Sequence, residues 1–270
     1  MDNKVFLEKQ DLTYLDWSHI RSSSGTAGTF LKSQSQLHGK KTYYKLSNYD
    51  PEKGVVGHEC INEIIVDRLL TILRVDHLSY ELINAEIEVE GRRLTTYLCA
   101  SRDFKQRGES KTALDNYYFT NAYKGESHYD FCVRQGWKDY IDTMIVVDYI
   151  IQNRDRHGAN IEVLRNPRAH TLRIAPLFDH GLSLLYSCRS DEEAEAFDVM
   201  EDRKCQCFIG TQSCHENLKL LKGRKDIFAG RLTDKDKYVL FCGLDGVLSQ
   251  VFIDKIWNMI YSRYREYESI

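Results

Sequence analysis

The sequence has few prolines, no long apolar run and no surplus of basic charge. Its 3 prolines argue against long irregular linkers. The opening residues MDNKVFLEKQDLTYLDW lack the apolar segment of a secretory signal, and no stretch reaches the about 20 apolar residues of a membrane-spanning helix. A formal net charge of -3 offers no basic footprint for nucleic acid. We therefore expect a cytoplasmic protein without a membrane span and without direct nucleic-acid binding; an effector exported by a non-classical route would have the same features.

The 8 cysteines are scattered along the chain, which predicts reduced thiols rather than a disulfide framework. Cys205, Cys207 and Cys214, followed by His215, lie close together in the sequence. They are candidate zinc ligands. Their spacing is not that of a CxxC pair, however, and no second matching pair follows, so a metal-free, cysteine-rich loop is the alternative.

The first part of the chain, residues 1–102, is predicted to form a lobe of strands around one helix. KKTYYKLSN is rich in residues that favour strands, and His58–Leu73 has apolar residues at helical spacing. Residues 77–100 predict two strands, a hairpin turn at Glu90-Gly91 and a third strand. RSSSGTAGTFLKS is a turn of small residues between extended pieces.

The second part, residues 103–270, is predicted to be mainly helical, with the boundary near Ser101–Phe104. Apolar periodicity predicts helices over Trp137–Gln152 and Val247–Tyr267. Between these helices, two strands are expected to meet at the turn Asn166-Pro167. The fold class is therefore α+β, with a β-rich N-lobe and a mainly helical C-lobe.

Two polar segments of this second lobe, residues 103–136 and 186–235, are expected to be irregular. Long polar loops on a rigid scaffold often bind substrate or carry regulation. The second segment includes CRSDEEAEAFDVMEDRK, which is mostly acidic.

The most informative stretch is NRDRHGAN, which follows the apolar helix predicted over 137–152. Asp155 and Asn160 are five positions apart, the interval between the catalytic aspartate and the metal-binding asparagine of the protein-kinase loop. Farther along, IAPLF is apolar enough for a buried strand that would deliver Asp179 of Asp179-His180-Gly181 to a cleft. A carboxylate and an amide oxygen are hard ligands suited to Mg²⁺.

The first lobe contains residues that would complement this loop. Backbone N–H groups of the turn Ser24–Gly28 can approach phosphates closely. Alternation along YYKL turns Lys45 away from its neighbours, and Glu63 on the following helix is its expected carboxylate partner, with Glu59 as the rival.

Each of these residues also has an ordinary alternative role. Asp155 and Arg156 would form a surface ion pair. Lys45 would be a solvated lysine on a strand, and His157 would be a histidine of the core. Asn160 and Asp179 would serve as hydrogen-bonding residues at a turn and a strand end. The order of all the elements along the chain favours the functional interpretation.

At these residues the chain resembles the HipA-like serine/threonine kinases. The resemblance rests on NRDRHGAN followed by APLFDHG, on the serines before the phosphate loop and on Asn62-Glu63, and it covers roughly residues 20–185. The Asp-Arg-His-x-x-Asn core is also shared with phosphatidylinositol 3- and 4-kinases. The resemblance implies a two-lobed, protein-kinase-like fold that uses ATP and Mg²⁺ to phosphorylate a protein.

The resemblance also implies roles for individual residues. Asp155 would be the catalytic base or hydroxyl-orienting group, and Asn160 and Asp179 would hold Mg²⁺. The expected nucleotide contacts are Gly25, Thr26 and Ala27 in the phosphate loop, Lys45 with Glu63, Cys99–Ser101 at the adenine, and His157. Autophosphorylation is expected at Ser22, Ser23 or Ser24, with Ser22 the closest match.

The sequence departs from the family in two ways. The phosphate loop has SSSGTAG where a small-Gly-Ala-Gln pattern is usual. The chain is also expected to start close to the kinase lobe, whereas HipA toxins carry an extra N-terminal subdomain. An antitoxin-type partner is therefore an alternative without support in the sequence. Two other functions stay open: a phosphatidylinositol or small-molecule kinase, and a nucleotide-binding pseudokinase. The acidic segment after Asp179 favours a basic protein substrate over an anionic lipid.

Overall fold

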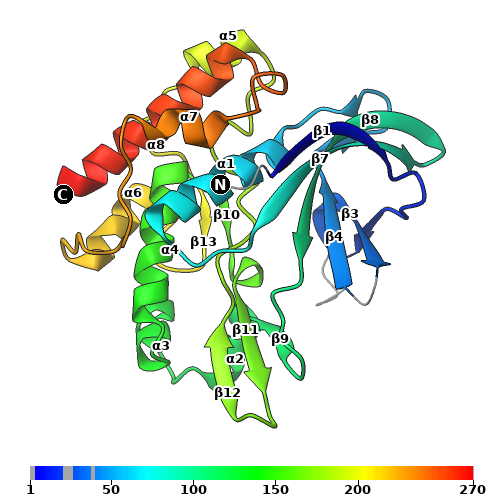
Figure 1. Ribbon diagram of the computed structural model, residues 1–270. Coiled ribbons are helices and arrows are strands. Elements are labelled where there is room, and N and C mark those ends of the chain that lie inside the picture. The colour runs from blue at the N-terminus through cyan, green and yellow to red at the C-terminus, as the bar shows by residue number, and fades with distance from the viewer. Residues whose placement is uncertain (1–3, 21–26, 38–39, 270) are drawn as a thin grey trace.

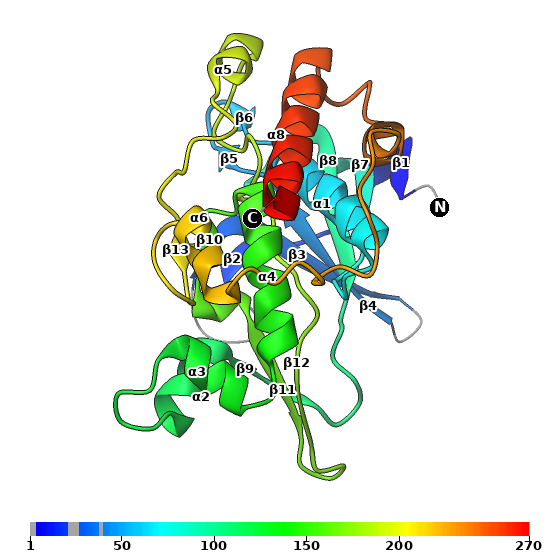
Figure 2. The same cartoon turned by 90° about the vertical axis from the view of Figure 1, so that its left-hand side faces the viewer.

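The computed structural model describes residues 4–20, 27–37 and 40–269. A twisted sheet forms one lobe and most helices gather in the other (Figures 1 and 2). The expected phosphate-loop residues Gly25 and Thr26, and the expected phosphorylation sites Ser22, Ser23 and Ser24, lie outside the described residues. Ala27 begins a strand of the sheet.

The sheet has six strands in the order β1-β7-β8-β4-β3-β2. Only β1 runs parallel to its neighbour, β7. The strand bounds are β1 (Val5–Asp11), β2 (Ser18–Ile20), β3 (Ala27–Leu37), β4 (Lys40–Leu46), β7 (Tyr80–Val89) and β8 (Arg92–Arg102).

The hairpin between β7 and β8 turns at Glu90 and Gly91, as predicted. Both residues have positive φ, 52° and 77°, which a tight two-residue hairpin turn requires. The expected division of the preceding segment into two strands is wrong, because β7 is continuous from Tyr80 to Val89. The side-chain amide of Asn84, within β7, donates a 2.9 Å hydrogen bond to the carbonyl of Leu7 on β1.

Helix α1 (Glu59–Leu73) connects the two lobes and is buried along almost its whole length. It packs against β7 and β8 on one side and against α7 (Asp236–Phe241) on the other (Figure 1). Residues of the sheet alternate between two cores: Leu82 faces the core that includes α1, and Ile83 faces a smaller core on the opposite side.

The helical lobe is built on α4 (Lys138–Ile151) and α8 (Gln250–Ser269), which pack against each other. Both were predicted from apolar periodicity. No helix among the described residues is long and apolar enough to cross a membrane.

The expected irregular segments contain short elements. Residues 103–136 include β9 (Ser110–Ala113), α2 (Leu114–Asn121) and α3 (His128–Arg134), so that expectation is wrong. Residues 186–235 hold α5 (Asp191–Ala196), β13 (Gln206–Cys207), α6 (Cys214–Asn217) and a 3-10 turn at Leu218–Leu221. The acidic stretch supplies the exposed residues of α5.

The predicted strand pair beyond α4 is present as β11 (Glu162–Asn166) and β12 (Thr171–Ile174), joined by a turn at Asn166. With β9 they form a three-stranded sheet, ordered β12-β11-β9. The segment IAPLF is not a strand beyond Ile174. Pro176 has no N–H for a ladder, and Leu177 makes only an isolated bridge with His77. Two further short pairs involve β5 (Tyr49–Asp50) with β6 (Gly54–Val55), and β10 (Asp155–Arg156) with β13.

Candidate active site

Lys45 lies between two carboxylates from different parts of the chain. On β4 it is directly opposite Cys99 of β8, so both residues face α1. Its ammonium donates a 3.0 Å hydrogen bond to Oε1 of Glu63 and another to Oδ1 of Asp179. The rival Glu59 instead accepts the backbone N–H of Asn48 at 3.0 Å. The structure therefore pairs Lys45 with Glu63.

Opposite charges dominate the protonation of this cluster. Burial acts to lower the pKa of Lys45, but the carboxylates of Asp179 and Glu63 outweigh burial and raise it well above its usual value. Burial acts to raise the pKa of Glu63, but Lys45 and the hydrogen bond from His180 hold it below its usual value. The lysine is therefore a fixed cation and the glutamate a fixed anion near neutral pH.

Helix α1 also fixes the segment that carries Asp179. Oε2 of Glu63 accepts the backbone N–H of His180 at 2.9 Å, and the amide of Asn62 donates to the carbonyls of Gly181 and Ser183 at 3.0 Å each. Gly181 lies so close to α1 that an added Cβ would be 3.1 Å from Cβ of Glu59. A larger residue here would have to displace α1 by a few tenths of an ångström.

Asp179 has a left-handed backbone conformation, with φ of 59°. Aspartate tolerates this region better than most residues, yet the conformation still costs free energy relative to an extended one. Its backbone N–H donates to the hydroxyl of Tyr80 at 3.2 Å. The surrounding hydrogen bonds thus hold the carboxylate toward Lys45.

The loop after α4 brings Asp155 and Asn160 together. The side-chain amide of Asn160 donates to the carbonyl of Asp155 at 2.8 Å and to its Oδ2 at 3.2 Å. The backbone N–H of Asp155 donates to Oδ1 of Asn153, and Asn153 in turn donates to Asp148 of α4 at 2.9 Å. The helix therefore supports the loop through side-chain hydrogen bonds.

Arg156 connects this loop to the segment before Asp179. Arg156 is fully buried and forms a two-point ion pair with Asp148, with Nε–Oδ2 and Nη2–Oδ1 distances of 3.0 Å. Its Nη1 donates to the carbonyls of Phe178 at 2.7 Å and Asn160 at 3.4 Å. The surface ion pair considered from the sequence is wrong for Arg156. The role of Asp148 was not predicted, although a carboxylate within the apolar stretch DTMIVVDYII indicates a buried pair.

A cleft of about 160 Å³ lies beside Lys45. Cys99 and Ser101, the expected adenine contacts, line it together with Asp179. Aromatic rings line it too: Phe104 packs against Phe178 with ring centroids 5.5 Å apart, and Tyr43 and Tyr80 are nearby. The aromatic residues were not found from the sequence.

His157 lies at a different hollow. Its Nε2 is 3.4 Å from Oδ1 of Asp155, and its ring lines a surface depression shared with Asp115, His128 and Phe208. The residues lining the cleft beside Lys45 do not include His157.

The donor set of Asn160 and Asp179 fits Mg²⁺. Both side chains offer hard oxygen atoms, the ligands that Mg²⁺ prefers. Nη1 of Arg156 donates hydrogen bonds to the carbonyl of Asn160 and to that of Phe178, which immediately precedes Asp179. The two expected ligands thus belong to adjacent, mutually fixed segments.

Comparisons with known proteins find similar structures but no similar sequences. No family model and no curated protein matches the sequence. The structure is similar to that of the proinflammatory kinase CtkA of Helicobacter pylori, with a TM-score of 0.69 and 13% identity over 97% of this chain and 98% of that chain. HipA of Shewanella oneidensis MR-1, solved with HipB and operator DNA, matches with a TM-score of 0.43 and 15% identity over 92% of this chain and 58% of that chain.

At such low identity the CtkA match establishes the fold. The expected α+β, two-lobed, kinase-like fold is confirmed.

Proposed function

We propose that this chain is a kinase that uses ATP and Mg²⁺ to phosphorylate a serine or threonine hydroxyl of a protein. The observation that carries the proposal is the position of Lys45 between Glu63 and Asp179. The adjacent loop holds Asp155 against Asn160. A fixed cation, a carboxylate that can orient a hydroxyl and a pair of hard oxygen ligands are the parts that phosphoryl transfer needs.

Each residue then has a defined task. Lys45 binds the phosphates of the nucleotide, and Glu63 holds its ammonium in position. Asp155 orients the attacking hydroxyl and accepts its proton. Asn160 and Asp179 are the residues that would hold Mg²⁺, which when bound supplies positive charge against the phosphate oxygens.

Binding of the nucleotide requires one contact to change. The cleft of about 160 Å³ is smaller than the roughly 300 Å³ at the lower end of small-molecule sites. Lys45 and Asp179, which contact each other, both line it. When the nucleotide binds, Lys45 would contact phosphate and Asp179 would contact Mg²⁺ in place of each other. This exchange would open the cleft while keeping the charges balanced.

A protein substrate is favoured over an anionic lipid by the charge of the segment after Asp179. Helix α5 presents Asp191, Glu192 and Glu193 in its exposed first turn, capped by the hydroxyl of Ser190. Negative charge at this position repels a phosphorylated lipid head group and attracts a basic peptide.

Phosphorylation of Ser22, Ser23 or Ser24 is part of the proposal. A phosphate adds roughly -1.5 to -2 charge next to the loop expected to bind the ATP phosphates, so it would oppose nucleotide binding. Intact-mass analysis and peptide mapping after incubation with Mg·ATP would detect it. Absence of phosphate from this segment in an active enzyme would refute self-regulation at these serines.

The central experiment measures transfer of label from γ-labelled ATP in the presence of Mg²⁺. The full chain is incubated alone, with basic and acidic test proteins, and with phosphatidylinositol vesicles. We expect label on protein that disappears in Asp155→Asn and persists in Asp234→Asn, a matched change at an exposed site. Label on lipid alone would identify a lipid kinase, and no transfer with intact ATP binding would identify a pseudokinase.

A further inference from the structure

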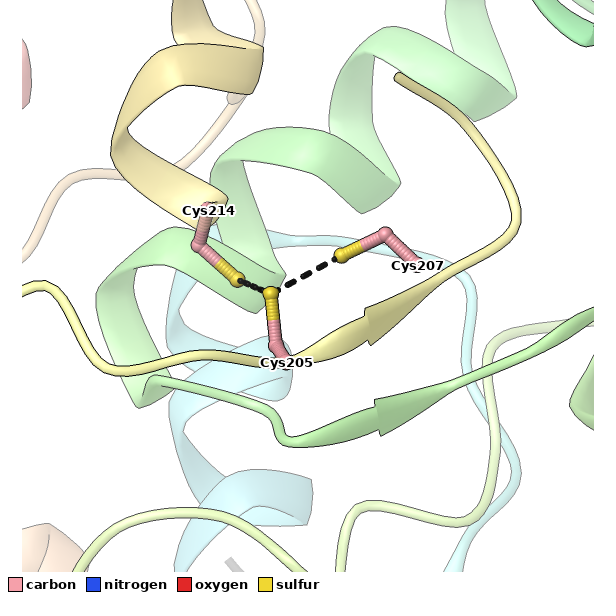
Figure 3. A group of neighbouring side chains, drawn as sticks. All are labelled: Cys205, Cys207 and Cys214. Atoms are coloured by element: carbon pink, nitrogen blue, oxygen red, sulfur yellow. Dashed lines mark hydrogen bonds between the residues drawn. The ribbon is translucent and has the colours of Figure 1, made fainter. Parts of the chain in front are cut away.

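Three cysteine sulfurs converge behind the loop that carries Asp155. The sulfur atom of Cys205 is 3.2 Å from that of Cys207 and 3.4 Å from that of Cys214, and all three lie within 4.8 Å of one another (Figure 3). Cys207 ends β13 and Cys214 begins α6. Cys205 and Cys214 are buried, whereas Cys207 is partly exposed.

The spacing of the sulfurs is close to that of a tetrahedral zinc–thiolate centre. Zn–S bonds of about 2.3 Å at tetrahedral angles separate the sulfurs by about 3.8 Å. The two measured pairs are a few tenths of an ångström shorter. An ion between them would therefore require outward movements of a few tenths of an ångström, and a cavity of about 10 Å³ is lined by Cys207 and Cys214.

The surrounding charge also suits an anionic centre. Arg263 is buried, and its guanidinium donates hydrogen bonds to the backbone carbonyls of Val199, Tyr149 and Glu201. These acceptors are neutral, and the groups within its electrostatic reach are the carboxylates of Asp202 and Glu266 as well as Cys214. A Zn²⁺ ion with three thiolates carries one net negative charge, which would stabilise this buried cation.

His215 is not part of the cluster, which corrects its place among the candidate ligands. Its Nε2 is 3.6 Å from Oε1 of Glu266, and its ring lies against Tyr149 with centroids 5.9 Å apart. The group of potential ligand atoms found among the described residues contains only the three sulfurs. Cys207 lines an open surface depression, through which water can reach the fourth position of a tetrahedral ion.

We propose that Cys205, Cys207 and Cys214 bind one Zn²⁺ ion, with water as the fourth ligand. On binding, the three thiols lose their protons to solvent and form Zn–S bonds, without any change of oxidation state. The three Zn–S bonds join the neighbouring thiols into one rigid unit, which fixes β13 to α6.

The ion would position the catalytic loop without touching substrate. β13 pairs with β10, so that Gln206 donates its N–H to the carbonyl of Arg154 at 2.9 Å and Phe208 donates to that of Arg156 at 2.8 Å. These two hydrogen bonds lie on either side of Asp155. A zinc site that holds β13 therefore holds the backbone around the proposed catalytic aspartate.

The test is the metal content of the full chain. The protein is produced with zinc in the medium, dialysed against a weak chelator and analysed for zinc, copper and iron by mass spectrometry. We expect one zinc per chain, released by a mercurial that caps thiols. Replacement by Co²⁺ should produce thiolate-to-cobalt charge-transfer absorption, which reports the sulfur ligands directly.

Two variants locate the site. Cys207→Ser removes the least buried ligand and should lose the stoichiometric zinc, whereas Cys242→Ser, at an exposed cysteine outside the cluster, should retain it. Retention of zinc by Cys207→Ser would overturn the assignment. So would a wild-type chain that contains no zinc, that holds copper or iron instead, or that has a mass showing a disulfide among the three cysteines. These measurements on the wild-type chain decide the question even if Cys207→Ser does not fold.

Discussion

Glu63 uses its two carboxylate oxygens to join Lys45 to the segment of Asp179. Oε1 accepts a 3.0 Å hydrogen bond from the ammonium of Lys45, and Oε2 accepts the backbone N–H of His180 at 2.9 Å. Because Glu63 belongs to α1, the position of that helix sets the geometry of both partners. The site therefore depends on contacts between three separate stretches of chain.

Replacement of Lys45 by methionine should reduce phosphoryl transfer by about 10²–10³-fold, the typical effect of removing one preorganised electrostatic group. Methionine keeps much of the length of the side chain but removes the charge between Glu63 and Asp179. Lys41→Met is the matched control, because Lys41 lies on the same strand and its ammonium lies over the ring of Tyr43, 4.8 Å from the centroid. Initial rates at saturating and limiting ATP would measure both variants. Equal activity of the two would contradict the role of Lys45.

Replacement of Asp179 by alanine should remove the dependence of nucleotide binding on Mg²⁺. The variant loses a proposed metal ligand but keeps Lys45, so ATP without Mg²⁺ should bind at least as well as it binds the wild type. Thermal shifts with ATP, in the presence and absence of Mg²⁺, would measure the difference. Asp155→Asn should keep the Mg²⁺-dependent shift of the wild type. If Asp179→Ala showed a Mg²⁺-dependent shift as large as those of these two proteins, the carboxylate of Asp179 would hold no metal.

Local patterns were sufficient to predict the principal pair of the site. Strand alternation at Lys45 and helical periodicity around Glu63 each determine which way a side chain faces, and the structure joins these two residues. The helices α4 and α8 and the turn at Glu90 were predicted for the same reason, since each depends on residues close together in the sequence.

Features that depend on distant contacts were not predictable in this way. β9 exists because it pairs with β11, some fifty residues later in the chain. Arg156 lies in a polar motif that suggested a surface ion pair, but its partner Asp148 belongs to the preceding helix, and it also donates to the carbonyl of Phe178. Two signals were nevertheless present in the sequence. Ser127 caps α3 by accepting the N–H of Asp130, and Pro176 excludes a continuous strand before Asp179.

Replacement of Asp148 by alanine should lower the free energy of unfolding by about 3–5 kcal/mol, because the buried charge of Arg156 loses its counter-ion. Asp139→Ala on the same helix is the matched control. The Asp139 side chain is 87% exposed and pairs with Arg224 at the surface, so its loss should cost about 0–1 kcal/mol. Urea unfolding of both variants would give the two values. A similar small loss at both sites would contradict a structural role for the buried pair.

The stability of the protein should fall as the pH decreases from about 6.5 to 4. His58 precedes α1 and packs edge-on against Phe252, with ring centroids 5.3 Å apart. Its Nε2 is buried and has no hydrogen-bond partner among the described residues. Burial, with a smaller contribution from the charge of Arg189, lowers the pKa of His58 to about 4. The unfolded chain therefore binds a proton below pH 6.5 that the folded chain does not, and stability is lost across this interval.

The contribution of His58 over that pH range is about 3 kcal/mol, from about 1.36 kcal/mol per unit of pKa difference. His58→Asn removes the titrating group, so the stability of this variant should fall less steeply with acidification. Asparagine also caps helices well, which suits a position just before α1. Some dependence should persist, because burial also lowers the pKa of His180. His170→Asn, at an exposed site, should follow the wild type. Urea unfolding at a series of pH values would measure the slopes, and a slope of His58→Asn equal to that of the wild type would show that His58 does not titrate in this interval.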